Sequence, residues 1–168
     1  MRSLKNYLVL GLMILPISGI AEEYLIKVKF SEVKLYLIKD GKEMTTFPVA
    51  VPSFIPKILP IEGKVVRIGK NPYWYPTERI KEQYSKKHKE ELPKTVKPGD
   101  PRNAMGVAEI VIEFKTQGVN PLIRIHGTND ANSIGHRITS GCIRMLNKDI
   151  LTLIEIINGK PTQILFEK

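Results

Sequence analysis

Alternation of hydrophobic and polar residues is the main pattern along the chain from residue 22 onward. In the first stretch, residues 24–30, every second position is hydrophobic, and the positions between include Lys27 and Lys29. A period of two is typical of a strand with one buried face. The same reasoning predicts further strands at residues 33–38, 45–51, 65–68, 107–114, 122–125 and 162–166. The Asp40-Gly41 pair predicts a tight hairpin turn, and the succession of strands predicts a mainly β fold, a sandwich or mixed sheet with a few short helices.

Two stretches have helical periodicity instead. Residues 77–91 read as a charged, solvated helix with Thr77 as N-cap, and we expect Pro93 to end it. Residues 149–158 form a helix with an apolar face and Gly159 as its C-cap. The prolines within residues 52–63 predict an ordered surface loop. The aromatic cluster at residues 71–76, which contains Trp74, fits a packed lid over the core or the wall of a substrate groove, and the two are compatible.

Residues 1–21 have the pattern of a signal peptide. Arg2 and Lys5 form a positive n-region, residues 7–15 are apolar apart from Gly11, and small residues follow at 19–21. The apolar run is well below the roughly 20 residues that span a bilayer. A buried N-terminal helix or an uncleaved anchor is the alternative. We therefore predict a leader at residues 1–21 and one domain at residues 22–168, which works in the periplasm or cell envelope with no membrane contact once mature.

The formal net charge is +9, and +7 remains once Arg2 and Lys5 of the leader are set aside. A basic surface suits nucleic acid, an acidic cell-wall polymer or simple solvation, so charge alone does not choose among them. No nucleic-acid-binding motif is present and the predicted leader points away from nucleic acid, so we expect no nucleic acid among the partners. The single cysteine, Cys142, excludes an intramolecular disulfide.

The candidate chemistry lies between residues 123 and 145. His126 and Cys142 are 16 positions apart with a loop between them, a spacing that allows an imidazole to activate a thiol. Gly141 precedes the cysteine and can bring main-chain N–H groups close to a substrate. A lone cysteine is more often a small buried hydrophobe, and His136 is a rival base, so spacing alone leaves catalysis open. A metal site would need more ligands than these.

This stretch contains the segment His126-Gly127-Thr128-Asn129 and, after a short loop, the segment Thr139-Ser140-Gly141-Cys142-Ile143-Arg144-Met145. These two segments resemble the signature of the L,D-transpeptidase catalytic domain (YkuD type) of bacterial cell-wall enzymes. The match covers essentially all of residues 22–168. It departs from the family at Ser140, where many members have histidine, after Trp74, where Pro-Pro is usual, and in Ala104-Met105, which replaces Pro-Leu. The residues that carry the resemblance are His126-Gly127-Thr128-Asn129, Ser133-Ile134-Gly135, Thr139-Ser140-Gly141-Cys142-Ile143-Arg144-Met145, Asn147 and Asp149, with outer landmarks at Leu35-Tyr36, Phe47-Pro48-Val49-Ala50-Val51, Asn71-Pro72-Tyr73-Trp74, Pro98-Gly99 and Asn103-Ala104-Met105-Gly106.

The resemblance implies an L,D-transpeptidase-like fold and a division of roles. Cys142 is the nucleophile, His126 the base, the Gly127 carbonyl orients the imidazole, and the N–H groups of Gly141 and Cys142 hold the oxyanion. Arg144 binds a stem carboxylate or, alternatively, pairs with Asp149. The remaining substrate-binding residues that it implies are Thr128, Asn129, Thr139, Ser140 and Trp74. It implies no metal or organic cofactor.

The implied substrate is a peptidoglycan tetrapeptide stem, typically with meso-diaminopimelate as its third residue. The acceptor is the amine of a second stem, which gives a 3-3 cross-link, or a lysine of a wall-anchored protein. Two alternatives stay open: hydrolysis of the same bonds by an L,D-carboxypeptidase or amidase, and a non-catalytic wall-binding domain with the same fold.

Overall fold

The computed structural model describes residues 22–54, 57–114, 116 and 122–168. The leader predicted at residues 1–21 lies outside these residues. Within them, no helix is long and apolar enough to cross a membrane. The two α-helices are α1 (Glu78–His88) and α2 (Asn147–Ile157), and a 3-10 turn, η1, spans Ala131–Ser133. The strands are β1 (Tyr24–Lys29), β2 (Lys34–Lys39), β3 (Lys42–Pro48), β4 (Val51–Pro52), β5 (Ile61–Lys70), β6 (Ala108–Phe114), β7 (Leu122–His126), β8 (Arg137–Thr139), β9 (Ile143–Arg144) and β10 (Thr162–Glu167).

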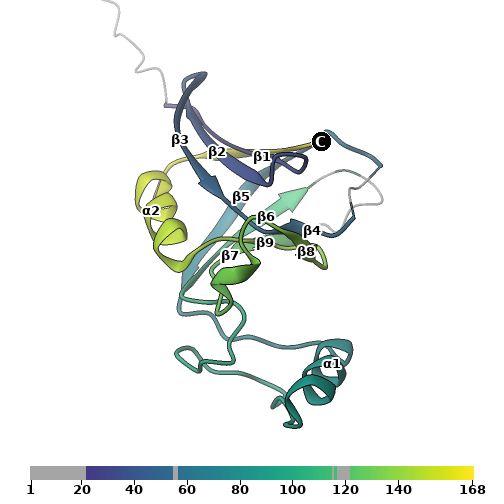
Figure 1. Ribbon diagram of the computed structural model, residues 1–168. Coiled ribbons are helices and arrows are strands. Elements are labelled where there is room, and N and C mark those ends of the chain that lie inside the picture. The colour runs from purple at the N-terminus through teal and green to yellow at the C-terminus, as the bar shows by residue number, and fades with distance from the viewer. Residues whose placement is uncertain (1–21, 55–56, 115, 117–121) are drawn as a thin grey trace, which may run out of the picture.

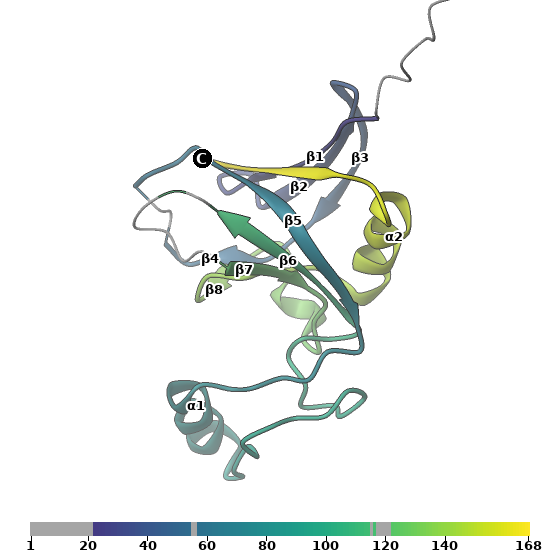
Figure 2. The same cartoon turned by 180° about the vertical axis from the view of Figure 1, so that it is seen from behind.

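Eight of these strands form one mixed sheet in the order β3-β2-β1-β10-β5-β6-β7-β9, and β4 pairs with β8 in a small parallel sheet. The large sheet is curled, and α2 covers one of its open sides (Figures 1 and 2). Two of its pairings are parallel, β1 with β10 and β7 with β9. The mainly β prediction is therefore confirmed, and the architecture is a curled mixed sheet.

The core fills the inside of the curl, where alternate residues of the long strands meet the apolar face of α2. Ile110 and Ile112 of β6 are 0% exposed. So are Ile125 of β7 and Ile143 of β9, which belong to the same hydrophobic cluster. The α2 side chains in this cluster are Ile150, Leu153, Ile154 and Ile157. The core thus fixes which face of β6, β7 and β9 points away from it, and that outer face carries the site.

Several predicted elements are confirmed. Asp40 and Gly41 both have positive φ, 49° and 76°, between paired residues of β2 and β3, as a two-residue hairpin turn requires. The Thr77 hydroxyl accepts the Ile80 N–H at 3.4 Å, which makes it the N-cap of α1. Gly159 follows α2 with φ of 72°, the left-handed conformation that ends helices.

Other boundaries were wrong. Helix α1 ends at His88 and not at Pro93, because Lys89 adopts a left-handed φ of 57° and its N–H caps the Ser85 carbonyl. Strand β5 runs from Ile61 and not from residue 65, so it takes in the end of the predicted proline loop. Its first residues pair with β10 although Glu62, Gly63 and Lys64 break the hydrophobic alternation. The strand predicted at residues 45–51 is divided between β3, which ends at Pro48, and β4, which begins at Val51. Strands β8 and β9 were not predicted, since two or three residues carry no periodicity.

Between β5 and β6 the chain leaves the sheet as residues 71–107, here called the α1 excursion, which lies below the sheet in Figure 1. Trp74 and Val96 hold its two arms together through a pair of main-chain hydrogen bonds of 3.0 and 2.9 Å. The buried Asn103 amide donates to the Pro72 and Lys97 carbonyls at 3.0 and 3.1 Å. These bonds give the excursion internal order although no side chain of α1 is buried.

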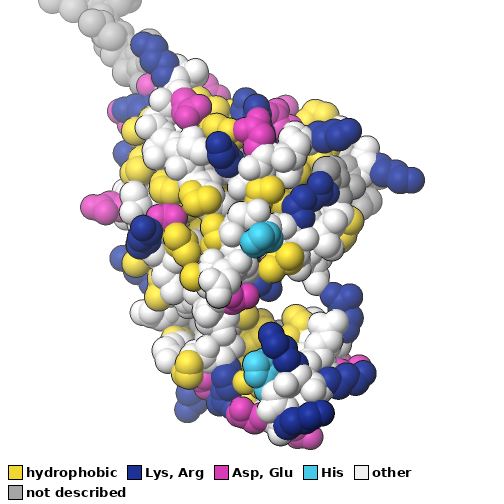
Figure 3. All heavy atoms as spheres, in the orientation of Figure 1, with side chains coloured by type: hydrophobic (Ala, Val, Ile, Leu, Met, Phe, Trp, Pro, Cys, Tyr) yellow, Lys and Arg dark blue, Asp and Glu magenta, His cyan; other side chains and the backbone are white. Residues whose placement is uncertain are grey.

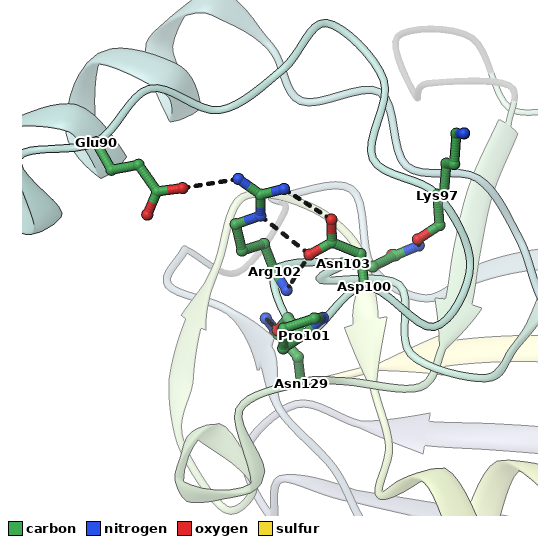
Figure 4. A network of polar contacts seen from close by, with 7 residues as sticks. All are labelled: Glu90, Lys97, Asp100, Pro101, Arg102, Asn103 and Asn129. Carbon is green, nitrogen blue, oxygen red and sulfur yellow. Dashed lines mark hydrogen bonds and ion pairs between the residues drawn. The ribbon is translucent and has the colours of Figure 1, made fainter.

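A second polar network orders the far loop of the α1 excursion (Figure 4). The Arg102 guanidinium contacts Asp100 through two nitrogens and reaches Glu90 at 2.7 Å. Hydrogen bonds from Arg102 lower the pKa of Asp100 to about 2. The Asn129 amide donates to the Pro101 carbonyl at 2.9 Å and so ties this loop to the residues that follow β7. The excursion is therefore fastened to the sheet next to the end of β7.

The position of Ile110 allows a test of this core. Ile110→Ala should lower the free energy of unfolding by about 2–5 kcal/mol, the usual cost of truncating a fully buried isoleucine. Val66→Ala, on the neighbouring strand and 45% exposed, should change it by less than about 1 kcal/mol. Urea unfolding followed by circular dichroism measures both. Equal losses in the two variants would contradict the core described here.

Candidate active site

The sequence motif folds onto the outer face of β6, β7 and β9. His126 lies opposite Glu109 of β6 and beside Arg144 of β9. Ile125 of β7 pairs with Ile143 of β9 in parallel. The residues that precede these two, Arg124 and Cys142, therefore also lie side by side. Because side chains alternate along strands, all of these residues point to the face that Ile125 and Ile143 do not use.

His126 and Cys142 are therefore neighbours on one face, one strand apart and offset by two residues. With strands about 4.8 Å apart and a rise of about 3.3 Å per residue, their Cα atoms are roughly 8 Å apart. Side chains on one face can meet across this diagonal. The predicted pairing of base and nucleophile is thus compatible with the register, while the catalytic roles stay predictions.

The His126 imidazole is held in one orientation. It is 4% exposed, and its Nδ1 lies 2.6 Å from the Gly127 carbonyl oxygen. A carbonyl can only accept, so Nδ1 carries the proton and Nε2 is left as the basic nitrogen. Burial lowers the His126 pKa to about 4, with smaller contributions from the positive charges of Arg144 and Arg124. The imidazole is therefore neutral at physiological pH.

Cys142 is a half-buried free thiol. Burial raises the pKa of the Cys142 thiol, and the Arg124 main-chain N–H and the charges of Arg124 and Arg144 oppose this rise. Burial thus favours the uncharged form of both the thiol and the imidazole. A neutral thiol and a neutral imidazole are therefore the forms that these pKa shifts favour at physiological pH.

Hydrogen bonds within the turn before Cys142 hold that turn in place. Thr139 is buried, and its hydroxyl donates to the Cys142 carbonyl at 2.6 Å and accepts the Gly141 N–H at 3.4 Å. Thr139 was expected to bind substrate, but its hydroxyl is occupied in bracing this turn. Gly141 has a φ of 153°, which residues with a side chain rarely adopt. Glycine is therefore required by this backbone conformation and not by crowding, since a Cβ at this position would meet no neighbouring atom within 4 Å. Its N–H makes only a long bond to Thr139, since about 2.9 Å is usual.

Asn147, at the start of α2, fastens three segments together. Its side-chain oxygen accepts the N–H groups of Thr128 and Val107 at 3.1 and 3.3 Å. A Cβ on Gly106 or on Gly127 would come within 2.2 Å of the same oxygen, so both glycines are required for this close approach. Asn147 thereby fixes the end of β7, which carries His126, against the root of the α1 excursion. Thr128 is buried here and not open to a substrate.

The α1 excursion approaches Cys142 at one point. Arg79 of α1 donates from Nη2 to the hydroxyl of Ser140 at 2.7 Å, two residues before Cys142. Figure 3 shows a hollow between the sheet and this excursion. Trp74 is instead bonded within the excursion, and Tyr73 and Tyr75 are 53% and 68% exposed, so the aromatic cluster does not cover the core.

The part of the chain that the structure describes does not support the alternative roles considered for His136 and Arg144 or a metal site. His136, the rival base, is exposed, and its carbonyl accepts the Val51 N–H. Among the ion pairs of the described residues none joins Arg144 to Asp149, so the alternative structural role of Arg144 is not supported. Over the same residues no three His, Cys, Asp or Glu side chains gather as metal ligands would.

Sequence reasoning missed the residues that surround this pair. Glu109 is 6% exposed in a strand whose other residues are apolar except Glu113, and Arg124 lies between two isoleucines. A charge at an alternate position of a buried strand was the available signal for both. Asn147 was noted only as part of the motif, because nothing local indicates that its side chain reaches residues 107 and 128.

Known proteins resemble this chain in sequence. The model of the YkuD family, L,D-transpeptidase catalytic domain, matches residues 23–164. The probable L,D-transpeptidase ErfK/SrfK of Salmonella typhimurium is 40% identical over 102 residues, which are 60% of this chain and 30% of that protein. Its namesake in Escherichia coli is 33% identical over 147 residues, 83% of this chain and 43% of that protein. The chain spans less than half the length of these relatives.

The fold is also known from solved structures. L,D-transpeptidase 3 from Mycobacterium tuberculosis aligns with a TM-score of 0.56 at 9% identity, over 88% of this chain and 62% of that one. At this level of identity the likeness concerns the fold alone.

The lowered pKa of His126 predicts a pH-dependent stability. Between the ordinary value of 6.5 and about 4, the unfolded chain binds a proton that the folded chain does not, so stability falls as pH falls through this window. From pH 7 to pH 4 this residue should cost about 3 kcal/mol.

Urea unfolding of the protein and of His126→Gln at both pH values tests this. The variant should lose about 3 kcal/mol less on acidification than the parent protein. His88→Gln, at a histidine exposed on α1, is the matched control and should behave like the parent. If His126→Gln and the parent lose equal stability, the buried neutral imidazole is wrong.

Proposed function

This chain belongs to the YkuD family of L,D-transpeptidase catalytic domains, and from that premise we propose that it is a peptidoglycan L,D-transpeptidase working through a thioester on Cys142. The observation that carries the proposal is the 2.6 Å contact of His126 Nδ1 with the Gly127 carbonyl. It leaves the basic Nε2 available on the face that Cys142 shares.

In the first half-reaction the substrate is a tetrapeptide stem. The Cys142 sulfur attacks the carbonyl carbon that joins the third residue, meso-diaminopimelate in the expected case, to the terminal D-alanine. The thiol proton passes to His126 Nε2. When the C–N bond breaks, His126 returns the proton to the leaving D-alanine amine, and a thioester remains on Cys142.

In the second half-reaction an acceptor amine attacks the thioester. His126 takes a proton from the amine and delivers it to the departing Cys142 sulfur, so the thiol is restored and a new amide is formed. A stem amine gives a 3-3 cross-link, and the lysine of a wall-anchored protein gives protein attachment. Water in place of the amine would give the L,D-carboxypeptidase outcome.

The electrostatics of the site bear on the timing of proton transfer. Because burial keeps both groups neutral, charge develops only while sulfur attacks. The positive charges of Arg144 and Arg124 and the main-chain N–H groups at Gly141 and Cys142 would stabilise the negative charge that then forms. Arg144 also suits a stem carboxylate, since a guanidinium binds one through two parallel hydrogen bonds.

We place this activity in the periplasm or cell envelope, where the substrate lies. The predicted leader at residues 1–21 and the basic net charge of the chain support this location. The acidic wall polymer is the partner that the charge suits.

Removal of the nucleophile tests the chemistry. Cys142→Ala should form no cross-links and release no D-alanine from tetrapeptide stems, as muropeptide analysis by mass spectrometry would show. Incubation with a carbapenem should add one drug mass per chain to the parent protein and none to the variant. Turnover by Cys142→Ala contradicts the thioester, and tripeptides without new dimers indicate hydrolysis.

The neutral pair predicts how the thiol reacts with an uncharged reagent. Alkylation of Cys142 by iodoacetamide should accelerate about tenfold per pH unit up to the raised thiol pKa, because only the thiolate reacts. Mass spectrometry at pH 6 to 9 gives the rates. A rate that stays flat over this range would reveal a preformed ion pair and contradict the neutral ground state.

A further inference from the structure

A buried carboxylate orders two arginines on the same face as Cys142. Glu109 of β6 has 8% of its side chain exposed, and both of its oxygens are occupied. Arg67 Nη2 of β5 donates to Oε1 at 2.7 Å, and Arg124 Nε of β7 donates to Oε2 at 3.0 Å. The two guanidinium groups therefore lie side by side over one carboxylate, and one positive charge is left uncompensated.

The guanidinium groups remain open on their outer side. The side chains of Arg67 and Arg124 are 55% and 43% exposed. Each uses one nitrogen on Glu109, and the described residues provide no other hydrogen-bond acceptor for either. Two ordered guanidinium groups with free donors form the kind of site that binds a carboxylate.

Arg67 reaches this face because of a local irregularity in β5. The register pairs Val65 with Ile112 and then Arg67 with Val111, so Val66 is an extra residue in a β-bulge. Without the bulge, Arg67 would pair with Ile110 and point into the core. Gly69 then leaves the space that the guanidinium needs, since a Cβ there would lie 3.1 Å from Arg67 Nη1.

The arginines and the nucleophile form one row across the sheet. Arg67 pairs with Val111 and Val111 with Arg124, and the β7–β9 register sets Arg124 beside Cys142. Since neighbouring strands are about 4.8 Å apart, the midpoint of the arginine pair over β6 is roughly 10 Å from Cys142. An extended peptide covers that distance in about three residues.

We propose that Arg67 and Arg124, held by Glu109, form a subsite for a carboxylate on the acyl part of the donor stem. This subsite rests on the proposed function and specifies its substrate. The carboxylate of the leaving D-alanine is only three bonds from the carbonyl carbon of the scissile bond, so it could approach Arg124 beside Cys142 but would not span the roughly 10 Å to the midpoint of the pair. The bound carboxylate therefore lies on the other side of that bond, among the residues that stay on the thioester.

Binding to the inactive protein tests the subsite without turnover. The ligands are two tetrapeptide stems that differ in one group: a carboxylate on the residues before the scissile bond is free in one and amidated in the other. Cys142→Ala should bind the free acid roughly tenfold more tightly than the amide, the usual effect of one hydrogen bond to a charged group. Adding Arg67→Gln should remove this preference and leave the affinity for the amide unchanged.

The matched control is Lys27→Gln, which also removes one positive charge from an ion pair. Lys27 lies on β1 and pairs with Glu167 of β10, outside the strands that carry Arg67, Arg124 and Cys142. Lys27→Gln should keep the tenfold preference. Thermal unfolding shows whether Arg67→Gln is folded. Arg67→Lys keeps the positive charge but lacks the planar guanidinium with its parallel donors, so it should keep part of the preference for the free acid. A full preference in Arg67→Gln, or an equal loss of preference in Lys27→Gln and Arg67→Gln, overturns the subsite.

Turnover separates failure of the subsite from failure of the function. If the active protein releases D-alanine from both stems equally well, the function stands and the subsite is wrong. If it releases none from either stem, the proposed function fails and the subsite fails with it. If Arg67→Gln forms the thioester normally but transfers it slowly, the carboxylate belongs to the acceptor, and its assignment to the donor is overturned.

Discussion

The parallel pairing of β7 with β9 is the constraint on which the rest of the site depends. Ile125 and Ile143 lie side by side in this pair, both fully buried. Their burial fixes the register, because a slip of β9 by one residue would turn Ile143 away from the core and bring Cys142 into it. His126 and Cys142 are thus positioned by the hydrophobic effect acting on their neighbours in the chain.

Short polar contacts then convert this register into a defined geometry. The Gly127 carbonyl selects the imidazole tautomer, Thr139 braces the turn before the nucleophile, and Asn147 joins the end of β7 to the root of the α1 excursion. Each is a side chain or main-chain group at low exposure, where an unmade hydrogen bond is costly. Precise placement of the site and stability of the fold are therefore served by the same few bonds.

Local patterns were enough to predict most of the long strands from hydrophobic alternation, the hairpin from the Asp40-Gly41 pair and both helices from helical periodicity, since each of these is encoded by residues close together in sequence. The motif from His126 to Met145 likewise identified the family. What could not be predicted depends on distant residues: the pairing of two-residue β9 with β7, the contacts of Asn147, and the meeting of Arg67 with Glu109 across 42 positions. Strand β5 was cut short because its first residues are stabilised by pairing and not by their own pattern.

The bulge at Val66 has a consequence for comparing this chain with its relatives. The extra residue shifts the alternation of inward- and outward-facing side chains along β5 by one position. The face of the sheet on which a later β5 side chain lies therefore depends on the number of residues between it and Ile61. A relative that lacks the extra residue would present a different set of side chains beside the residue equivalent to Cys142, even if its amino-acid sequence in this strand were closely similar. Alignments of this strand should therefore be anchored on the sheet partners Ile110 and Ile112, and substrate preference can diverge through a single insertion or deletion as readily as through substitution.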